Sequence, residues 1–110
     1  MEVSYVDPKL EKLLADERAL KRAYAANVVK ALRVRITSVY TSANLRELHA
    51  LPGGTRALKG NRAGEFAMDL PGGLRLILRP TEPLPRHEDG GIDLAAVTRI
   101  TIIEISEHYT

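Results

Sequence analysis

The sequence has 110 residues, of which 45% are apolar and 27% are charged, and its formal net charge is +2. This length predicts one domain over residues 1–110, and without a long apolar segment or a basic leader we expect neither a membrane span nor a signal peptide, but a cytoplasmic protein. The lack of cysteines excludes disulfides and thiolate metal sites, and the three histidines have no metal-ligand spacing, so no metal or other cofactor is expected.

The first 24 residues predict a strand followed by a helix. "MEVSYV" alternates enough for a short strand. Asp7 and Pro8 then supply an N-cap and a first-turn proline, so a helix is expected to begin there. Leucines and Tyr24 recur at helical spacing, and this pattern predicts one continuous helix as far as residue 24.

A second apolar pattern of helical period runs over residues 28–40, and we expect it to form an antiparallel pair with the first helix. Lys30 and Arg33 lie away from its apolar arc, so both are expected to face solvent and to be available to a partner. "SANLREL" predicts one further helical turn, capped by Ser42.

After "LPGG" the apolar period changes from helical to two. Residues 66–70 and 74–79 alternate on either side of "PGG", which predicts a β-hairpin. Residues 80–96 contain three prolines and "EDGG" and predict a long loop. Residues 97–105, "VTRITIIEI", give the strongest strand pattern and predict a central strand. The order of elements predicts an α+β fold, with an N-terminal strand and a helix pair packed on a small twisted, mainly antiparallel sheet.

The charge is unevenly distributed along the chain. Between Arg18 and Arg62 there are ten basic residues and one acid, Glu47, a net charge of +9, whereas residues 63–110 carry −4. A basic half of this strength favours a polyanionic partner such as RNA, or an acidic protein that neutralises it. The alternative is that these charges only solvate helix faces.

Two clusters in the second half carry a family resemblance. "NLRELHALPGGTRALKGNRAGEFAMDL", followed by "LRLILRP" and a terminal "IIEISEHY", resembles the RelE/ParE superfamily of bacterial toxins. The likeness is strongest to the HigB-like branch, the plasmid maintenance system killer proteins. It covers roughly residues 43–79 and 97–109. It implies a RelE-like fold over the whole chain, with residues 80–96 as a loop insert relative to the shortest members.

The resemblance also implies a function. Family members are small cytoplasmic toxins encoded beside an antitoxin, and many cleave mRNA in the ribosomal A site and so inhibit translation. For this chain it implies a type II toxin that is a ribosome-dependent, metal-independent mRNA endoribonuclease, with a cognate antitoxin and ribosome-bound mRNA as partners. Two alternatives remain on the same fold: a ParE-like inhibitor of DNA gyrase, and a non-catalytic binding or suppressor module.

RNA cleavage without a metal needs a base for the 2′-OH, charge stabilisation at phosphorus and an acid for the leaving oxygen. Lys59 and Arg62 lie three residues apart in a glycine-containing loop and are expected to reach one phosphate. The family's hairpin arginine corresponds to Arg75, whose planar fork suits bidentate phosphate contact. The candidate set is catalytic Glu107, His108, Tyr109 and Arg75, and RNA- or phosphate-binding Arg56, Lys59, Asn61 and Arg62.

The chain departs from the nuclease relatives at three places. Their terminal cluster reads acid-Tyr-His, whereas this chain has Glu107, His108 and Tyr109, so the two ring residues are exchanged. Arg56 stands where some relatives have a histidine. Pro71 stands where some have a hairpin arginine. The phosphate-binding residues are mostly retained, whereas the acid-base set differs.

Overall fold

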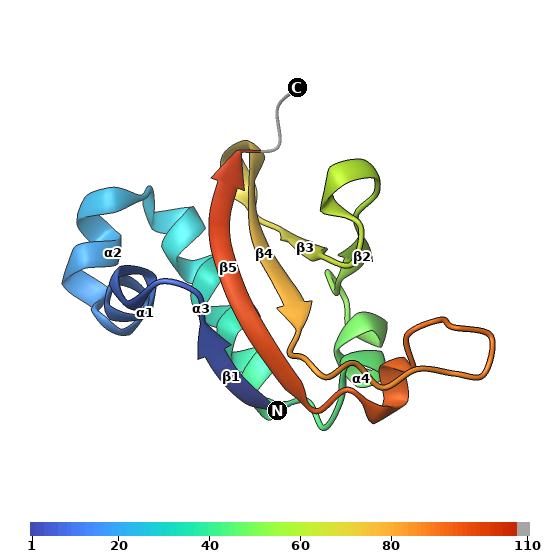
Figure 1. The fold of residues 1–110 in the computed structure, drawn as a ribbon. Helices are drawn as coiled ribbons and strands as arrows, with labels where there is room; N and C mark the ends of the chain where they lie inside the picture. The colour runs from blue at the N-terminus through green and yellow to red at the C-terminus, as the bar shows by residue number, and fades with distance from the viewer. Residues whose placement is uncertain (108–110) are drawn as a thin grey trace.

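The computed structural model describes residues 1–107, so His108, Tyr109 and Thr110 lie outside the described residues. Within this range there are four α-helices, five strands and three short 3-10 turns (Figure 1). In chain order they are β1 (Glu2–Tyr5), α1 (Pro8–Ala15), α2 (Glu17–Ala23), α3 (Ala26–Thr41), α4 (Leu45–Ala50), β2 (Arg56–Ala57), η1 (Gly60–Arg62), β3 (Phe66–Asp69), η2 (Pro71–Gly73), β4 (Leu74–Pro80), η3 (Leu94–Ala96) and β5 (Arg99–Glu107).

The strands form one mixed sheet in the order β1-β5-β4-β3-β2. Only the β1–β5 pair is parallel among the described strands, and the other three pairs are antiparallel. β5 is therefore an interior strand, as the run 97–105 predicted. Its Ile100 and Ile102 are fully buried. The α+β prediction, with a small and mainly antiparallel sheet, is confirmed.

The prediction of one helix through residue 24 is wrong, because the chain breaks at Asp16. Its backbone is extended, at φ −110° and ψ 102°, and its carboxylate accepts a hydrogen bond from the Ala19 N–H. Asp7 caps α1 in the same way through the Lys9 N–H. Because an aspartate competes for backbone donors, Asp16 ends α1 and begins α2.

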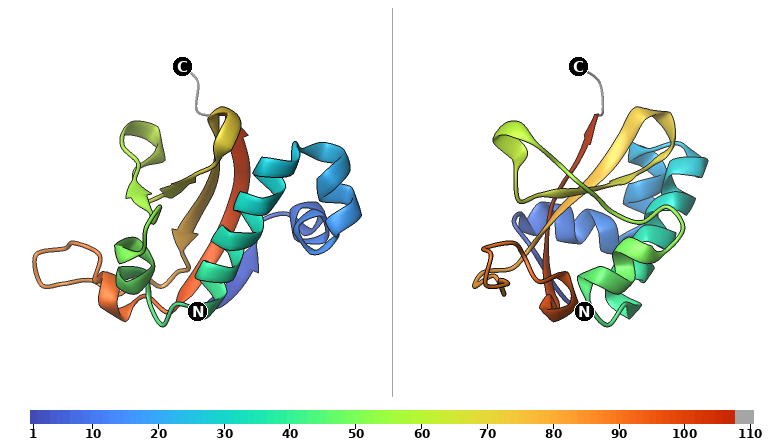
Figure 2. Two further views of the ribbon diagram at one scale, coloured as in Figure 1. Left: turned by 180° about the vertical axis from the view of Figure 1, so that it is seen from behind. Right: turned by 90° about the vertical axis from the view of Figure 1, so that its right-hand side faces the viewer.

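α3 lies across one face of the sheet, as the view from behind shows (Figure 2, left). Its buried residues Val28, Val29, Leu32 and Val39 belong to the same apolar cluster as the inward residues of β3, β4 and β5. The short helix after it was expected to be capped by Ser42. Asn44 is the cap instead, because its side chain accepts from the Glu47 N–H at 2.9 Å.

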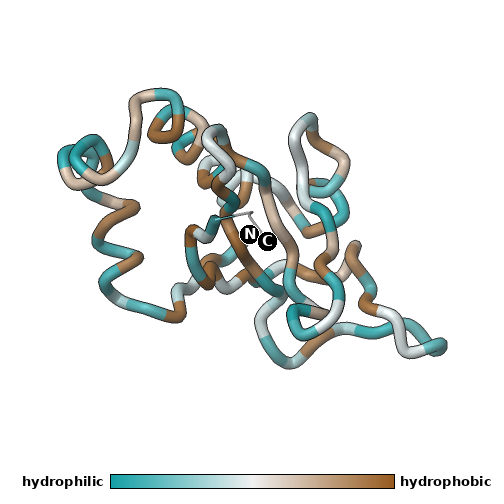
Figure 3. Tube along the Cα trace, turned by 90° about the horizontal axis from the view of Figure 1, so that it is seen from above, coloured by the Kyte–Doolittle hydropathy of each residue, from teal (hydrophilic) through white to brown (hydrophobic). Residues whose placement is uncertain are grey.

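The predicted hairpin is confirmed as β3 and β4, which pair from Phe66↔Leu78 to Asp69↔Arg75. Gly72 adopts φ +74° in the turn, a conformation that glycine tolerates best. Residues 81–98 are mostly irregular, with the bridge Arg86↔Ile92 and the turn η3, as the loop prediction required. This loop extends away from the sheet, and its tip is mainly hydrophilic (Figure 3).

The sheet has two unlike faces. On β4, Leu76 and Leu78 point into the core beneath α3, so the alternate residues Arg75, Ile77 and Arg79 point to the other face. We call this second side the open face. Seen from the side, α3 lies on one side of the strands and the η1 loop rises on the other (Figure 2, right). No helix in residues 1–107 is both long and apolar enough to cross a membrane.

Candidate functional site

The open face is organised by the pairing of the strands. The register places Asp69 opposite Arg75 and Arg75 opposite Ser106, so three polar residues form a row across β3, β4 and β5. The next row along the strands contains Ala67, Ile77 and Glu104. The polar row ends at Ser106, the residue before Glu107 at the end of β5.

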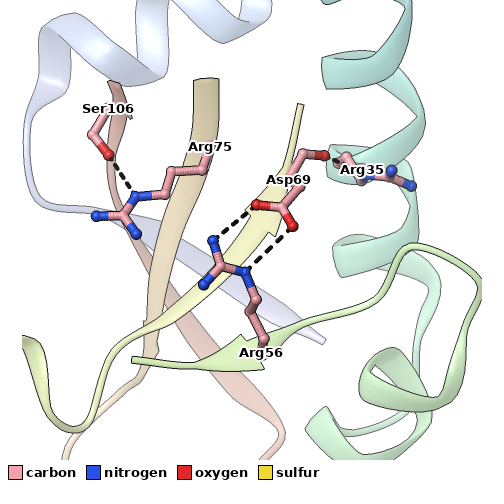
Figure 4. A network of polar contacts seen from close by, with 5 residues as sticks. All are labelled: Arg35, Arg56, Asp69, Arg75 and Ser106. Carbon is pink, nitrogen blue, oxygen red and sulfur yellow. Dashed lines mark hydrogen bonds and ion pairs between the residues drawn. The ribbon is translucent and has the colours of Figure 1, made fainter. Parts of the chain in front are cut away.

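Arg56 is held on the open face by a paired contact with Asp69. Its terminal amino group and its Nε donate to the two carboxylate oxygens at 3.0 and 3.3 Å (Figure 4). Arg35 from α3 donates to the backbone carbonyl of Asp69 at 3.4 Å. Asp69 therefore joins a residue of the helix layer to a candidate RNA-binding residue, and a bidentate pair fixes the direction of the guanidinium.

Arg75 is oriented by the neighbouring strand. Its Nε donates to the Ser106 Oγ at 3.2 Å (Figure 4). Glu107 follows Ser106 directly, is exposed and pairs with Leu74 in the register. Arg75 and Glu107 thus stand one residue apart in the ladder, at the same end of the sheet, but strand alternation places Glu107 on the face opposite to Arg75. The predicted His108 and Tyr109 lie outside the described residues.

Arg62 ties the η1 loop to the sheet. Its guanidinium contacts the Glu65 carboxylate at 2.6 Å and the Glu104 carboxylate at 3.3 Å. Hydrogen bonds to Glu65 and then to Glu104 raise the pKa of Arg62, so its charge is permanent. Because Glu104 is opposite the fully buried Ile77, the loop crosses the middle of the open face. Two carboxylates already occupy Arg62, and a phosphate would have to displace at least one.

Lys59 and Asn61 are exposed in the η1 loop, and neither side chain has a hydrogen bond or ion pair within residues 1–107. Gly60 and Gly64 flank this segment with φ values of +66° and +93°, which explains why the loop contains two glycines. Within residues 1–107, the Lys59 side chain has no carboxylate partner, whereas the Arg62 guanidinium is paired with two carboxylates. Lys59 and Arg62 therefore do not share an acidic partner within the described part of the chain.

Sequence reasoning missed three residues of the open face. Asp69 and Ser106 orient Arg56 and Arg75, and only strand register reveals them. Arg79 is an exposed third arginine, four residues after Arg75 and on the same face. The period of two in "LRLILRP" was the signal that would have found it. Among the described residues, no three histidine, aspartate or glutamate side chains cluster as a metal site.

A second surface feature is a groove of about 480 Å³ between α2 and α3. Its apolar lining includes Tyr24, Val29 and Val34, and Val34 is 52% exposed. The basic residues Lys21, Lys30 and Arg33 also line it. Lys30 and Arg33 are exposed, as predicted from the sequence. We call this feature the α2–α3 groove.

One acid lies within the α2–α3 groove. Arg33 donates to the Glu17 carboxylate at 2.6 Å, and Lys21 lies 3.4 Å from the same oxygen. The hydrogen bond to Lys21 and the charge of Arg33 lower the pKa of Glu17. The groove thus already attracts and holds a carboxylate of the chain itself.

Comparison with known proteins gives a structural relative. The sequence matches no protein-family model and no curated protein. The fold is similar to a solved YoeB/ParE toxin from Agrobacterium tumefaciens, with a TM-score of 0.60 over 99% of this chain and 100% of that chain. The two sequences are 17% identical, so the likeness shows a shared fold.

Proposed function

We propose that the chain is the toxin of a type II toxin–antitoxin pair and that it cleaves mRNA on the ribosome. The observation that carries this proposal is the open face, where Arg75 is held in a fixed direction beside the end of β5 and Arg56 is held in a fixed direction on β2. The fold shared with a YoeB/ParE toxin and the HigB-like sequence motifs support the same conclusion. Because the substrate is translating ribosomes, the protein acts in the cytoplasm.

The open face supplies cations for the phosphate chemistry. Attack of the 2′-oxygen on phosphorus builds negative charge on the nonbridging oxygens, and fixed guanidinium groups stabilise that charge most where they need no reorganisation. Arg75, oriented by Ser106, takes this role. Arg56 and the exposed Lys59 bind neighbouring phosphates, and Asn61 adds a neutral donor. Arg62 contributes after exchanging a carboxylate for a phosphate oxygen.

The acid and base come from the end of β5. Glu107 accepts the proton of the 2′-OH, and His108 or Tyr109 protonates the leaving 5′-oxygen. Glu107 follows Ser106 at the end of β5, and strand alternation directs it to the face opposite to Arg75. This role therefore requires the end of β5 to turn Glu107 toward the open face when RNA binds. The products are a 2′,3′-cyclic phosphate or a 3′-phosphate and a free 5′-hydroxyl.

A reconstituted cleavage assay tests this activity. Purified protein is added to ribosomes translating a defined mRNA and to the same mRNA without ribosomes, each with and without a chelator. We expect cleavage only on ribosomes, unaffected by the chelator, with ends of the stated chemistry. An mRNA that stays intact on translating ribosomes would contradict the proposal. So would a loss of cleavage on adding the chelator while the ribosomes remain intact.

DNA gyrase inhibition is the second candidate on this fold, and it needs none of the acid-base residues. A supercoiling assay separates the two. Inhibited gyrase with intact mRNA would support the alternative, whereas an effect on neither target would favour a non-catalytic binding module.

We further propose that an acidic segment of the antitoxin docks in the α2–α3 groove. Exposed apolar residues rimmed by charge mark protein interaction sites, and Val34 lies among three basic side chains here. An amphipathic acidic helix offers both the apolar face and the carboxylates. Arg33 and Lys21 already bind the carboxylate of Glu17 in this groove, and the acidic side chains of the partner would make contacts of the same kind.

This docking is tested with the product of the neighbouring open reading frame. Its affinity should fall steeply with ionic strength, because the main attraction is between opposite charges. Lys30→Glu should weaken binding, whereas Lys9→Glu, an exposed lysine on α1, should have little effect. An affinity that does not change with salt concentration would show that electrostatic attraction is not the main source of binding. Equal losses of affinity in Lys30→Glu and Lys9→Glu would show that the antitoxin does not bind in the α2–α3 groove.

A further inference from the structure

A cavity of about 510 Å³ lies beside the open face, between the segment that follows η1 and the loop after β4. Ala63, Gly64 and Glu65 line it from one side, and residues of the 80–92 segment line it from the other. Its volume is within the range of ligand-binding cavities. The cavity therefore depends on the loop that follows β4.

The cavity is continuous with the open face through Arg79. Phe66 and Leu78 are the last registered pair of the hairpin, and Arg79 follows Leu78 on the face that also carries Arg75. The two arginines are four residue steps apart along β4, about 13 Å at about 3.3 Å per residue. Arg79 is exposed, and its side chain has no hydrogen bond or ion pair to any of residues 1–107. Its guanidinium is available to a ligand.

The other cavity residues differ in how far their charges are already used. Glu65 is bound to Arg62 at 2.6 Å, and Arg86 donates to the Gly90 carbonyl at 2.7 Å within its own loop. Glu82 is exposed, and its carboxylate has no partner among the described residues. Arg79 and Glu82 are therefore the charged side chains of this cavity with no internal contact among the described residues, whereas Arg86 keeps its positive charge but is tied to its own loop.

The chemistry of this combination fits one nucleotide of an RNA strand. The Arg79 fork suits a phosphate. The half-buried Leu84 and Ile92 provide an apolar wall against which a base can lie. The Glu82 carboxylate accepts from an exocyclic amino group, which adenine and cytosine carry and uracil lacks. A purely acidic ligand would leave Glu82 facing a like charge.

We propose that this cavity is a nucleotide subsite, which binds one residue of the RNA strand beyond the bond that is cleaved, with Arg79 on its phosphate and Glu82 on its base. This subsite rests on the proposed action on RNA, since it extends the same open face. It would favour adenine or cytosine over uracil at one position of the strand.

The experiment measures binding alone, so that its failure is distinct from a failure of catalysis. Single-stranded oligoribonucleotides with 2′-O-methyl groups, which resist cleavage, are prepared in a short form and a form extended by a few nucleotides at either end. Affinities are measured over a series of salt concentrations. Arg79→Ala is compared with Arg22→Ala, which removes an exposed arginine of α2, and with Arg79→Lys, which keeps charge but loses the fork.

We expect Arg79→Ala to weaken binding of one extended strand about 10-fold or more while leaving the short strand unchanged, because one charged phosphate contact is lost. The slope of log affinity against log salt should become shallower by about 0.7, the value for one phosphate of a single strand. Arg79→Lys should fall between, and Arg22→Ala should match the wild type. Glu82→Ala should abolish the preference for adenine or cytosine over uracil.

The outcomes separate the two proposals. Binding with the expected Arg79 dependence, but no mRNA cleavage, would support the subsite and contradict the ribonuclease. Equal losses for short and extended strands, or no loss beyond that of Arg22→Ala, would overturn the subsite even if cleavage is observed. The subsite would also be overturned if the protein binds no RNA but binds a poly-glutamate peptide in a manner that depends on Arg79. That result would identify a protein-binding site instead.

Discussion

Replacing Arg75 by alanine removes the guanidinium that we place at the phosphate. Loss of a fixed donor to the transition state costs about 2.7 to 4 kcal/mol, or about 10²- to 10³-fold in rate. Ser106→Ala leaves the charge and removes a hydrogen bond between Arg75 Nε and a neutral hydroxyl at 3.2 Å. Such a bond contributes about 0.5 to 1.5 kcal/mol, which corresponds to about 2- to 12-fold. The two variants should therefore differ by at least about 10-fold.

Single-turnover cleavage on stalled ribosomes measures both variants, with circular dichroism and thermal melting as folding controls. Arg46→Ala, an exposed arginine on α4, is the matched control and should keep full activity. A Ser106→Ala variant as slow as Arg75→Ala would mean that the hydroxyl itself acts in the reaction. An Arg75→Ala variant with full activity and native fold would refute the assignment of charge stabilisation to Arg75.

Two further predictions concern folding and titration. Gly54→Ala should destabilise the protein by about 1 to 3 kcal/mol in a denaturant titration, because the added Cβ would lie 2.6 Å from two backbone carbonyl oxygens of α4. Gly91→Ala is the control and should be near neutral, because its added Cβ meets only a flexible side chain at 3.2 Å. Equal effects of the two substitutions would contradict the packing argument. In an NMR carboxyl titration Glu17 should protonate at lower pH than a glutamate in an unstructured peptide, because Lys21 and Arg33 stabilise its charged form. The contribution of Glu17 to stability should be present at neutral pH and lost as the pH falls through its lowered pKa. Removing the Arg33 side chain should move the titration midpoint of Glu17 to higher pH. A midpoint that this change does not move would show that the Glu17–Arg33 pair does not form in solution.

Local chemistry made much of the fold predictable. The period of two around "PGG" located the hairpin, and Asp7 with Pro8 located the start of α1. The break at Asp16 was missed because the leucine spacing continues across it, and the cap bond to Ala19 prevails over that spacing. The parallel pairing of β1 with β5 joins the two ends of the chain, and no local pattern encodes such a contact.

The site was predictable in composition and less so in its contacts. The motifs located Arg75 and the η1 loop, and strand register then places Arg75 beside the end of β5. The ion pair between Arg62 and Glu104 joins residues 42 positions apart, so no local pattern predicted that this arginine is already paired with a carboxylate. Asp69 and Ser106 act only through neighbouring strands, and their roles follow from pairing rather than from residue type.

The most direct test of the proposed ribonuclease is to express the chain from an inducible promoter, with and without the neighbouring open reading frame, and to map 5′ ends of cellular mRNA. We predict growth arrest with new 5′ ends inside translated codons, absent when translation initiation of the reporter is blocked and suppressed by the neighbouring gene product. Growth arrest with intact mRNA, or cuts that fall equally in untranslated RNA, would contradict ribosome-dependent cleavage.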